Sequence, residues 1–157
     1  MIIRELEERD DAAVAALVRR NLEKAGLALP GTAYFDEMLD RLSDVYGRDG
    51  SRYFVLENES GRVVGGIGFA PFRSMKDTAE LQKLYLDDAV KGAGLGYRLI
   101  AFVEERMREG GFVFSYLETH DALAAAIHVY QKCGYREIDR PTTVGHGGMN
   151  RFFLKKL

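Results

Sequence analysis

The chain has 157 residues, with 22 Lys and Arg against 24 Asp and Glu, a net charge of −2 and a single cysteine. A chain of this length can bury enough apolar surface to fold as one domain over residues 1–157 without disulfides or a structural metal. One cysteine excludes an internal disulfide and multi-cysteine zinc sites, and the balanced charge excludes the clustered basic face with which proteins bind nucleic acid. There is no apolar run long enough to span a membrane and no signal-peptide pattern, so we expect a cytoplasmic protein that binds neither membranes nor nucleic acid.

The N-terminal half of the chain is predicted to contain three strands and two helices. The strands are expected over Ile2–Glu5, Arg52–Glu57 and Arg62–Ala70. The first helix is capped by Asp10, and the second, capped by Thr32 and ended by Gly47, carries its apolar residues on one face. The turn Asn58–Gly61 joins two β-rich runs, which indicates a hairpin.

The C-terminal half is predicted to contain four strands and two helices. The strands are expected over Thr78–Leu86, Phe112–Thr119, Tyr135–Ile138 and Met149–Leu154. One helix covers Gly94–Glu109, and the other places Tyr130 on an apolar stripe and stops at Gly134. A strand, a crossover helix and a further strand, with hairpins on both sides, imply an α/β fold in which a mixed sheet carries helices on its faces.

Glycine accounts for 17 residues, and three of them cluster in Lys91-Gly-Ala-Gly-Leu-Gly96, between a strand and a helix. Glycines at such a junction let several N–H groups point the same way, and the helix dipole adds positive potential, so the turn suits phosphate. The dinucleotide fingerprint fails because Tyr97 or Leu99 occupies its last position, and the P-loop fails because no Gly-Lys-Ser/Thr follows. On spacing alone, an ordinary flexible loop remains an alternative.

A second motif, Ala126-Ile-His-Val-Tyr-Gln-Lys-Cys-Gly-Tyr135, follows the glycine turn. It fits the pattern A-I-x-L-Y-x-K-x-G-F, while Lys91, Gly94 and Gly96 fit R/Q-x-x-G-x-G/A with Lys in the first position. With these motifs the chain resembles the Gcn5-related N-acetyltransferase (GNAT) family, and the resemblance covers about half of the chain. Leu123 stands where many members carry an Asn that contacts the cofactor, which implies that this contact is absent.

The resemblance implies the GNAT fold, a twisted mixed sheet of about seven strands with about four helices, in which the fourth and fifth strands splay apart in a V. It also implies acetyl-CoA as the cosubstrate and no metal. The pyrophosphate would lie on the amides of the glycine turn, and the pantetheine arm would run beside the preceding strand. The implied cofactor-binding residues are Leu84, Tyr85, Leu86, Lys91, Gly92, Ala93, Gly94, Leu95, Gly96 and Tyr97.

Acetyl transfer to an amine needs a proton acceptor for the amine and a proton donor for the departing thiolate, because amines are mostly protonated at neutral pH. Glu118 is the preferred base, since some family members keep a catalytic Glu at the end of this strand. Glu80, early in the cofactor strand, is the second candidate, and a water chain is the third. The resemblance assigns Tyr130 as the acid, against the alternative of a buried core aromatic.

Three residues are candidates to line the acceptor site: Tyr34, His120 and His146. His128 is expected to face solvent, and Cys133 to serve as a small apolar residue. The acceptor is expected to be a primary amine of a small molecule or of a protein N-terminus. The resemblance also leaves open a homodimer formed through the final strands.

The sequence therefore predicts an N-acetyltransferase that moves the acetyl group of acetyl-CoA to an amine by direct attack in a ternary complex. The alternative is a catalytically inactive acyl-CoA-binding or sensor domain of the same fold, which the departure at Leu123 keeps open. The presence of both Glu118 and Tyr130 favours the enzyme.

Overall fold

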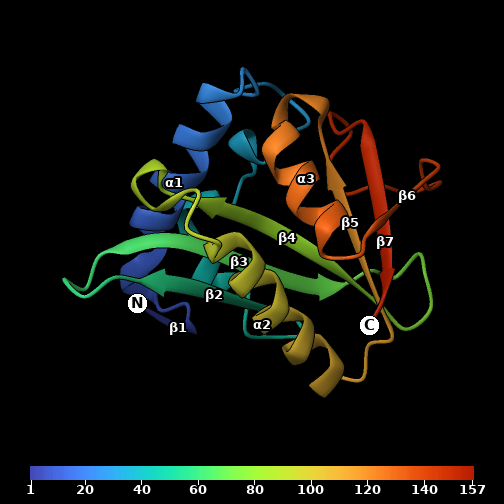
Figure 1. Cartoon of the computed structure of the whole chain (residues 1–157), viewed down its shortest axis with the longest axis horizontal. Helices are drawn as coiled ribbons and strands as arrows, with labels where there is room; N and C mark the ends of the chain where they lie inside the picture. The colour runs from blue at the N-terminus through green and yellow to red at the C-terminus, as the bar shows by residue number, and fades with distance from the viewer.

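The computed structural model describes residues 1–157 and contains one seven-stranded sheet. The strands lie in the order β1-β2-β3-β4-β5-β7-β6, and every neighbouring pair is antiparallel except β4 and β5 (Figure 1). The strands are β1 Ile2–Glu5, β2 Arg52–Glu57, β3 Val63–Pro71, β4 Thr78–Leu86, β5 Phe114–Thr119, β6 Arg136–Ile138 and β7 Arg151–Lys156. The α-helices are α1 Asp11–Lys24, α2 Leu95–Glu109 and α3 Ala124–Lys132. This architecture confirms the predicted mixed α/β sheet.

The helix expected between Thr32 and Gly47 differs from its prediction. The segment forms two 3-10 helices, η2 Ala33–Phe35 and η3 Leu39–Asp44, rather than one α-helix. Thr32 does cap the start of η2, because its hydroxyl accepts a hydrogen bond from the Tyr34 N–H. Asp36 then adopts an extended conformation, with φ −57° and ψ 125°, and its side chain turns to partners elsewhere in the fold. Tertiary contacts thus override the helical periodicity of the apolar residues.

Two apolar cores pack on the two faces of the sheet. Alternate residues of β2 separate them, since Phe54 and Leu56 belong to one core and Tyr53 and Val55 to the other. The first core contains the buried faces of α2 and α3, which stand in front of the sheet in Figure 1, and the second contains α1 and η3. None of the helices combines the length and apolar character needed to cross a membrane.

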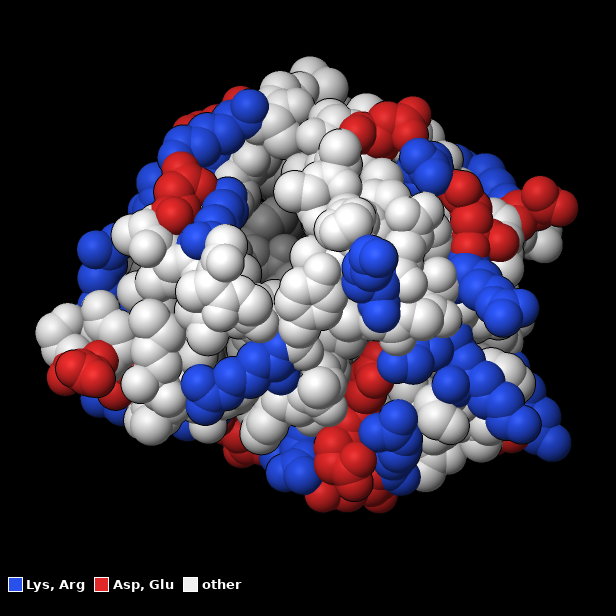
Figure 2. Space-filling view, viewed as in Figure 1, with Lys and Arg blue, Asp and Glu red and all other residues white.

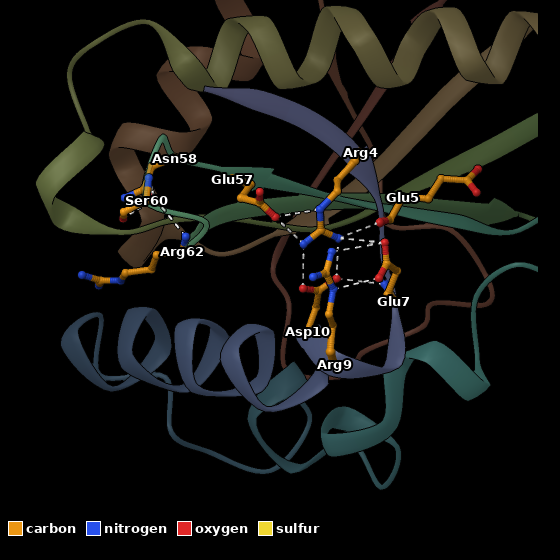
Figure 3. Close-up of polar contacts among 9 residues, drawn as sticks. All are labelled: Arg4, Glu5, Glu7, Arg9, Asp10, Glu57, Asn58, Ser60 and Arg62. Atoms are coloured by element: carbon orange, nitrogen blue, oxygen red, sulfur yellow. Dashed lines mark hydrogen bonds and ion pairs between the residues drawn. The ribbon is translucent and has the colours of Figure 1, made fainter.

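Arg4 joins the first strand to the start of α1 (Figure 3). Its Nη1 and Nη2 donate hydrogen bonds of 2.7 and 2.9 Å to the carboxylate of Asp10, and its Nε and Nη2 donate bonds of 2.8 and 2.6 Å to Glu57 of β2. The Asp10 carboxylate also accepts the Glu7 backbone N–H at 2.9 Å. Because Asp10 is buried, this bidentate pairing fixes the position of α1 over β1 and β2.

Strands β4 and β5 are paired only where they begin. Residues Thr78–Glu80 pair with Phe114–Tyr116. Beyond these residues the two strands continue to Leu86 and Thr119 without pairing with each other. The register of β4 against β3 shifts between Gly66 and Gly68, which leaves an extra residue on β4, and Lys83 at this bulge has a φ of 49°. The V-shaped opening predicted between the fourth and fifth strands is therefore confirmed.

The buried ring of Tyr53 supports the bulge. Its hydroxyl donates a 2.9 Å hydrogen bond to the Lys83 carbonyl, which the irregular ladder leaves without a strand partner. A Cβ on Gly66 or Gly68 would overlap the Tyr53 ring, so these two glycines provide the space that the ring occupies. The side chain of one strand thus holds the backbone of another in an unusual conformation.

We predict that Tyr53→Phe lowers the free energy of unfolding by about 1–3 kcal/mol, because the substitution leaves the partly buried Lys83 carbonyl without its donor. Urea denaturation measures this change. The control is Tyr97→Phe, which removes the hydroxyl of an exposed tyrosine. Equal stability of the two variants would contradict a role of Tyr53 in holding the bulge.

Candidate active site

The glycine turn lies between the 3-10 helix η4 (Asp88–Val90) and α2. Gly92 and Gly94 have φ values of 80° and 73°, a region that residues with side chains rarely adopt, and a Cβ on either would meet nothing within 4 Å. Gly94 is the N-cap of α2, and no side chain caps this helix. The first N–H groups of α2 are therefore left to bind an external acceptor, at the positive end of a 15-residue helix.

Asn21 of α1 connects this turn to the end of β4. Its Nδ2 donates to the carbonyl of Leu86 at 3.1 Å, and its Oδ1 accepts the ammonium of Lys91 at 2.9 Å. Lys91 also donates to Asp88 at 2.6 Å. Lys91 replaces the Arg or Gln of the family pattern, and these contacts place its charge beside the glycine turn.

The end of β4 lines an opening on the surface. Leu84, Tyr85 and Leu86 lie beyond the last residue that pairs with β5, so one edge of this segment carries no strand partner. Figure 2 shows a hollow in the surface over the end of β4, between α3 and the segment that leads into α2. A Cβ on Gly96 would lie 3.7 Å from Val129 of α3 and 3.9 Å from Leu86. The glycine turn, the end of β4 and α3 thus meet at one place.

Two carboxylates stand where β4 and β5 begin to part. Glu80 is the last residue of β4 paired with β5, and Glu118 lies two residues beyond the Tyr116 with which Glu80 is paired. Both carboxylates approach Gly145 of the loop between β6 and β7. A Cβ on Gly145 would lie 3.4 Å from Oε1 of Glu80 and 3.4 Å from Oε1 of Glu118. The structure thus brings together the two base candidates, which are 38 residues apart in the sequence (118 − 80 = 38).

The two carboxylates differ in how many hydrogen bonds they accept. Glu118 accepts three, each of 2.9 Å, from the Tyr116 hydroxyl and from the backbone N–H groups of Gly145 and His146. Glu80 accepts one from a protein side chain, the 3.1 Å bond from Gln82 to its Oε2. Its Oε1 is therefore the one oxygen of the two carboxylates that accepts no hydrogen bond from the protein.

Burial raises the pKa of Glu80 to about 6, and the neighbouring charge of Glu118 adds to this effect. The hydrogen bond from Gln82 and the charges of His146 and Lys83 act in the opposite direction. A carboxylate with this pKa is largely ionised at neutral pH and is still basic enough to accept a proton from an amine.

Tyr130 belongs to α3 and is buried in the core that α2 and α3 form with the sheet. Its ring packs edge-on against Tyr135, with ring centroids 6.0 Å apart. Burial raises the pKa of Tyr130, so the phenol keeps its proton at neutral pH. Burial also raises the pKa of Tyr85 on β4, and Tyr130 makes a further contribution.

An ion-pair network that the sequence analysis missed adjoins the carboxylates. Asp36 accepts a 2.9 Å contact from the Lys83 ammonium and lies 2.8 Å from Nε2 of His146. Burial opposes the ionisation of Asp36, but its contacts with His146 and Lys83 outweigh burial and hold the pKa of the carboxyl below its ordinary value. Neither Asp36 nor Lys83 belongs to a recognisable motif, and their pairing joins segments far apart in the sequence.

The sequence of residues 16–135, more than half of the chain, matches the acetyltransferase (GNAT) family. The chain belongs to this family. It is 41% identical over 140 residues to the uncharacterized N-acetyltransferase YjgM of Escherichia coli K12, and the match covers 88% of this chain and 83% of that protein. The protein is therefore an acyltransferase, and acetyl transfer is its class of reaction.

Solved structures of the GNAT family share the fold of this chain. A GNAT acetyltransferase from Staphylococcus aureus Mu50 superimposes with a TM-score of 0.86 at 20% identity, over 99% of this chain and 98% of that chain. A phosphinothricin acetyltransferase from Sinorhizobium meliloti, solved in complex with AcCoA, gives a TM-score of 0.78 at 19% identity, over 99% and 88% of the two chains. These structures confirm the predicted GNAT fold.

The remaining predicted residues of this GNAT protein have defined contacts. Tyr34 donates a 2.6 Å hydrogen bond to Glu23 of α1, and the His120 ring accepts the Ala122 N–H at 3.0 Å as a cap of the 3-10 helix η5 (Asp121–Leu123). His146 alone of the three predicted acceptor residues contacts the carboxylate network. His128 is exposed, as expected, and Cys133 packs partly buried against the core of α2 and α3.

We predict that Glu80→Gln stabilises this GNAT fold by about 2 kcal/mol near pH 7.5 and has little effect near pH 4.5. Because the pKa of Glu80 is raised, folding favours the protonated form of this side chain. The stability that protonated Glu80 contributes is fully present below pH 4.5, its ordinary pKa, and is lost as the pH rises through about 6. Denaturation in urea at both pH values measures the difference. Glu59→Gln, in the exposed β2–β3 turn, controls for the loss of one surface carboxylate, and a pH-independent effect of Glu80→Gln would contradict the prediction.

Proposed function

We propose that this chain transfers the acetyl group of acetyl-CoA to a primary amine, of a small molecule or of a protein N-terminus, by direct attack in a ternary complex. The observation that carries the proposal is the parting of β4 and β5, with Glu80 where the two strands part and the glycine turn beyond the unpaired end of β4. A cofactor and an amine can meet in such an opening. When bound, acetyl-CoA supplies a thioester whose carbonyl carbon accepts the amine nitrogen.

The residues of the glycine turn fit the pyrophosphate of this cosubstrate. Gly92 and Gly94 have no side chain to block an approach, and the uncapped start of α2 offers N–H groups to phosphate oxygens. Lys91 adds a positive charge at the turn, and Leu84, Tyr85 and Leu86 provide the free strand edge for the pantetheine arm. The binding of AcCoA by the phosphinothricin acetyltransferase of the same fold supports this assignment. The proposed binding residues are those predicted from the sequence, including Ala93, Leu95, Gly96 and Tyr97.

Glu80 is the proposed base, in preference to Glu118. Its Oε1 has a free lone pair, and its pKa of about 6 suits the removal of a proton from an ammonium group at neutral pH. Glu118 instead uses its oxygens to bind Tyr116, Gly145 and His146, so we propose that it positions the loop between β6 and β7. The sequence alone favours Glu118 because of its place at the end of its strand. The hydrogen bonds of the two carboxylates favour Glu80 instead.

Tyr130 is the proposed acid. Its hydroxyl donates a proton to the sulfur as the carbon–sulfur bond breaks, while the amine forms the new carbon–nitrogen bond and Glu80 holds the proton that the amine has lost. The raised pKa of Tyr130 keeps the phenol protonated before the reaction. It also favours rapid recovery of the proton from solvent afterwards.

We expect Gly94→Glu to weaken the binding of CoA at least about 10-fold, because the added carboxylate would stand where the pyrophosphate binds. Isothermal titration calorimetry with CoA measures the dissociation constant. The matched control is Gly111→Glu, which places the same residue at another positive-φ glycine with open surroundings, just beyond the opposite end of α2. Unchanged CoA affinity in Gly94→Glu would refute the phosphate assignment of the glycine turn.

We expect Tyr130→Phe to lower kcat about 100-fold or more and to leave the affinity for acetyl-CoA nearly unchanged, because only the proton donor is removed. The release of free CoA from acetyl-CoA over a panel of primary amines measures the rate. Turnover by the unmodified enzyme with at least one amine supports the proposed function. Binding of acetyl-CoA without turnover on any amine would favour the inactive acyl-CoA-binding domain, and full activity of Tyr130→Phe would remove the phenol from the mechanism.

A further inference from the structure

We infer that the acceptor of this enzyme is a small free amine and not the N-terminus of a polypeptide. The inference rests on the proposed function and narrows it to one of its two acceptor classes. The observation behind it is a strap over the carboxylates, formed by residues 30–36 and residues 144–149, which come from opposite sides of the opening between β4 and β5.

The two segments of the strap touch backbone to backbone. The N–H of Gly148 donates a 2.8 Å hydrogen bond to the carbonyl of Gly31. A Cβ on Gly148 would lie 2.7 Å from that carbonyl oxygen, and a Cβ on Gly31 would lie 2.7 Å from the Gly148 nitrogen. An approach this close leaves no space for another chain to pass between the two segments.

A second contact fastens the strap to β4. His146 and Asp36 meet across the strap at 2.8 Å, and Asp36 also pairs with Lys83 at 2.9 Å. Lys83 is the bulged residue of β4, and its side chain is only 10% exposed. The ion pair is thus largely shielded from solvent, which makes it stronger than a pair on the surface.

A third contact fastens the strap to β5. The N–H groups of Gly145 and His146 both donate 2.9 Å hydrogen bonds to Glu118. The strap is therefore anchored on both strands that border the opening. It crosses the opening directly over Glu80, because Glu80 and Glu118 approach Gly145 equally closely.

The position of the strap limits what can follow the reacting amine. A polypeptide continues by about 3.3–3.6 Å for each residue beyond its N-terminus, so it needs a groove that leads away from Glu80. The strap spans this path with two backbone segments and an ion pair. A small amine needs no such groove, and the carboxylate of Glu80 provides the negative charge that attracts an ammonium group.

Two conjugates of CoA test this inference. In one, a carboxymethyl group on the CoA sulfur forms an amide with propylamine, and in the other the same group forms an amide with the N-terminus of an alanine-rich hexapeptide. We expect the propylamide to bind at least about 10-fold more tightly in isothermal titration calorimetry. Equal or tighter binding of the peptide conjugate would overturn the inference. CoA itself is the third probe, because failure to bind CoA would instead overturn the proposed function.

Variants of the strap test its role in the discrimination. Gly148→Ala places a methyl group against Gly31 and should separate the two segments, so the ratio of the two dissociation constants should fall at least about threefold. Gly147→Ala is the matched control, since its Cβ meets nothing within 4 Å, and it should keep the original ratio. Asp36→Ala, which removes the links to His146 and Lys83, gives a second way to loosen the strap and should lower the ratio too. Unchanged ratios in Gly148→Ala and Asp36→Ala would overturn the role of the strap.

Discussion

The bulge at Lys83 is the constraint on which the site depends. A regular β4 would continue to pair with β5, and the residues after Glu80 would lose their free strand edge. The positive φ of Lys83 is unfavourable for a residue with a side chain, so the surrounding structure must offset its cost. The buried hydroxyl of Tyr53 and the ion pair of Lys83 with Asp36 both act on this residue, one on its backbone and one on its side chain.

The two contacts of Lys83 also connect the opening to the loops that border it. The backbone is held by β2 through Tyr53, and the side chain reaches Asp36, which in turn contacts His146. A change in the bulge would therefore alter both the unpaired end of β4 and the strap above the carboxylates. In the proposed mechanism, one irregularity thus both separates the two strands for the thioester and limits the space for the amine.

The sequence marks the glycine turn more clearly than the contacts of Asp36, and the reason is the distance along the chain between interacting residues. Gly92, Gly94 and the start of α2 are neighbours in the chain, so their pattern is visible in the sequence. The pairing of Asp36 with Lys83 and His146 joins segments 47 and 110 residues away (83 − 36 = 47; 146 − 36 = 110). Nothing in the sequence marks Lys83 as a residue with positive φ, because such positions are usually glycine.

The same long-range contacts separate the roles of the two glutamates, which their positions in the sequence could not. Both lie on strands that border the opening, and burial and mutual repulsion act on the pair. The N–H groups of Gly145 and His146 donate to Glu118, and the charge of Glu118 adds to burial in raising the pKa of Glu80. The loop between β6 and β7 therefore distinguishes the two carboxylates, because its N–H groups bind Glu118 and leave Oε1 of Glu80 without a hydrogen bond from the protein.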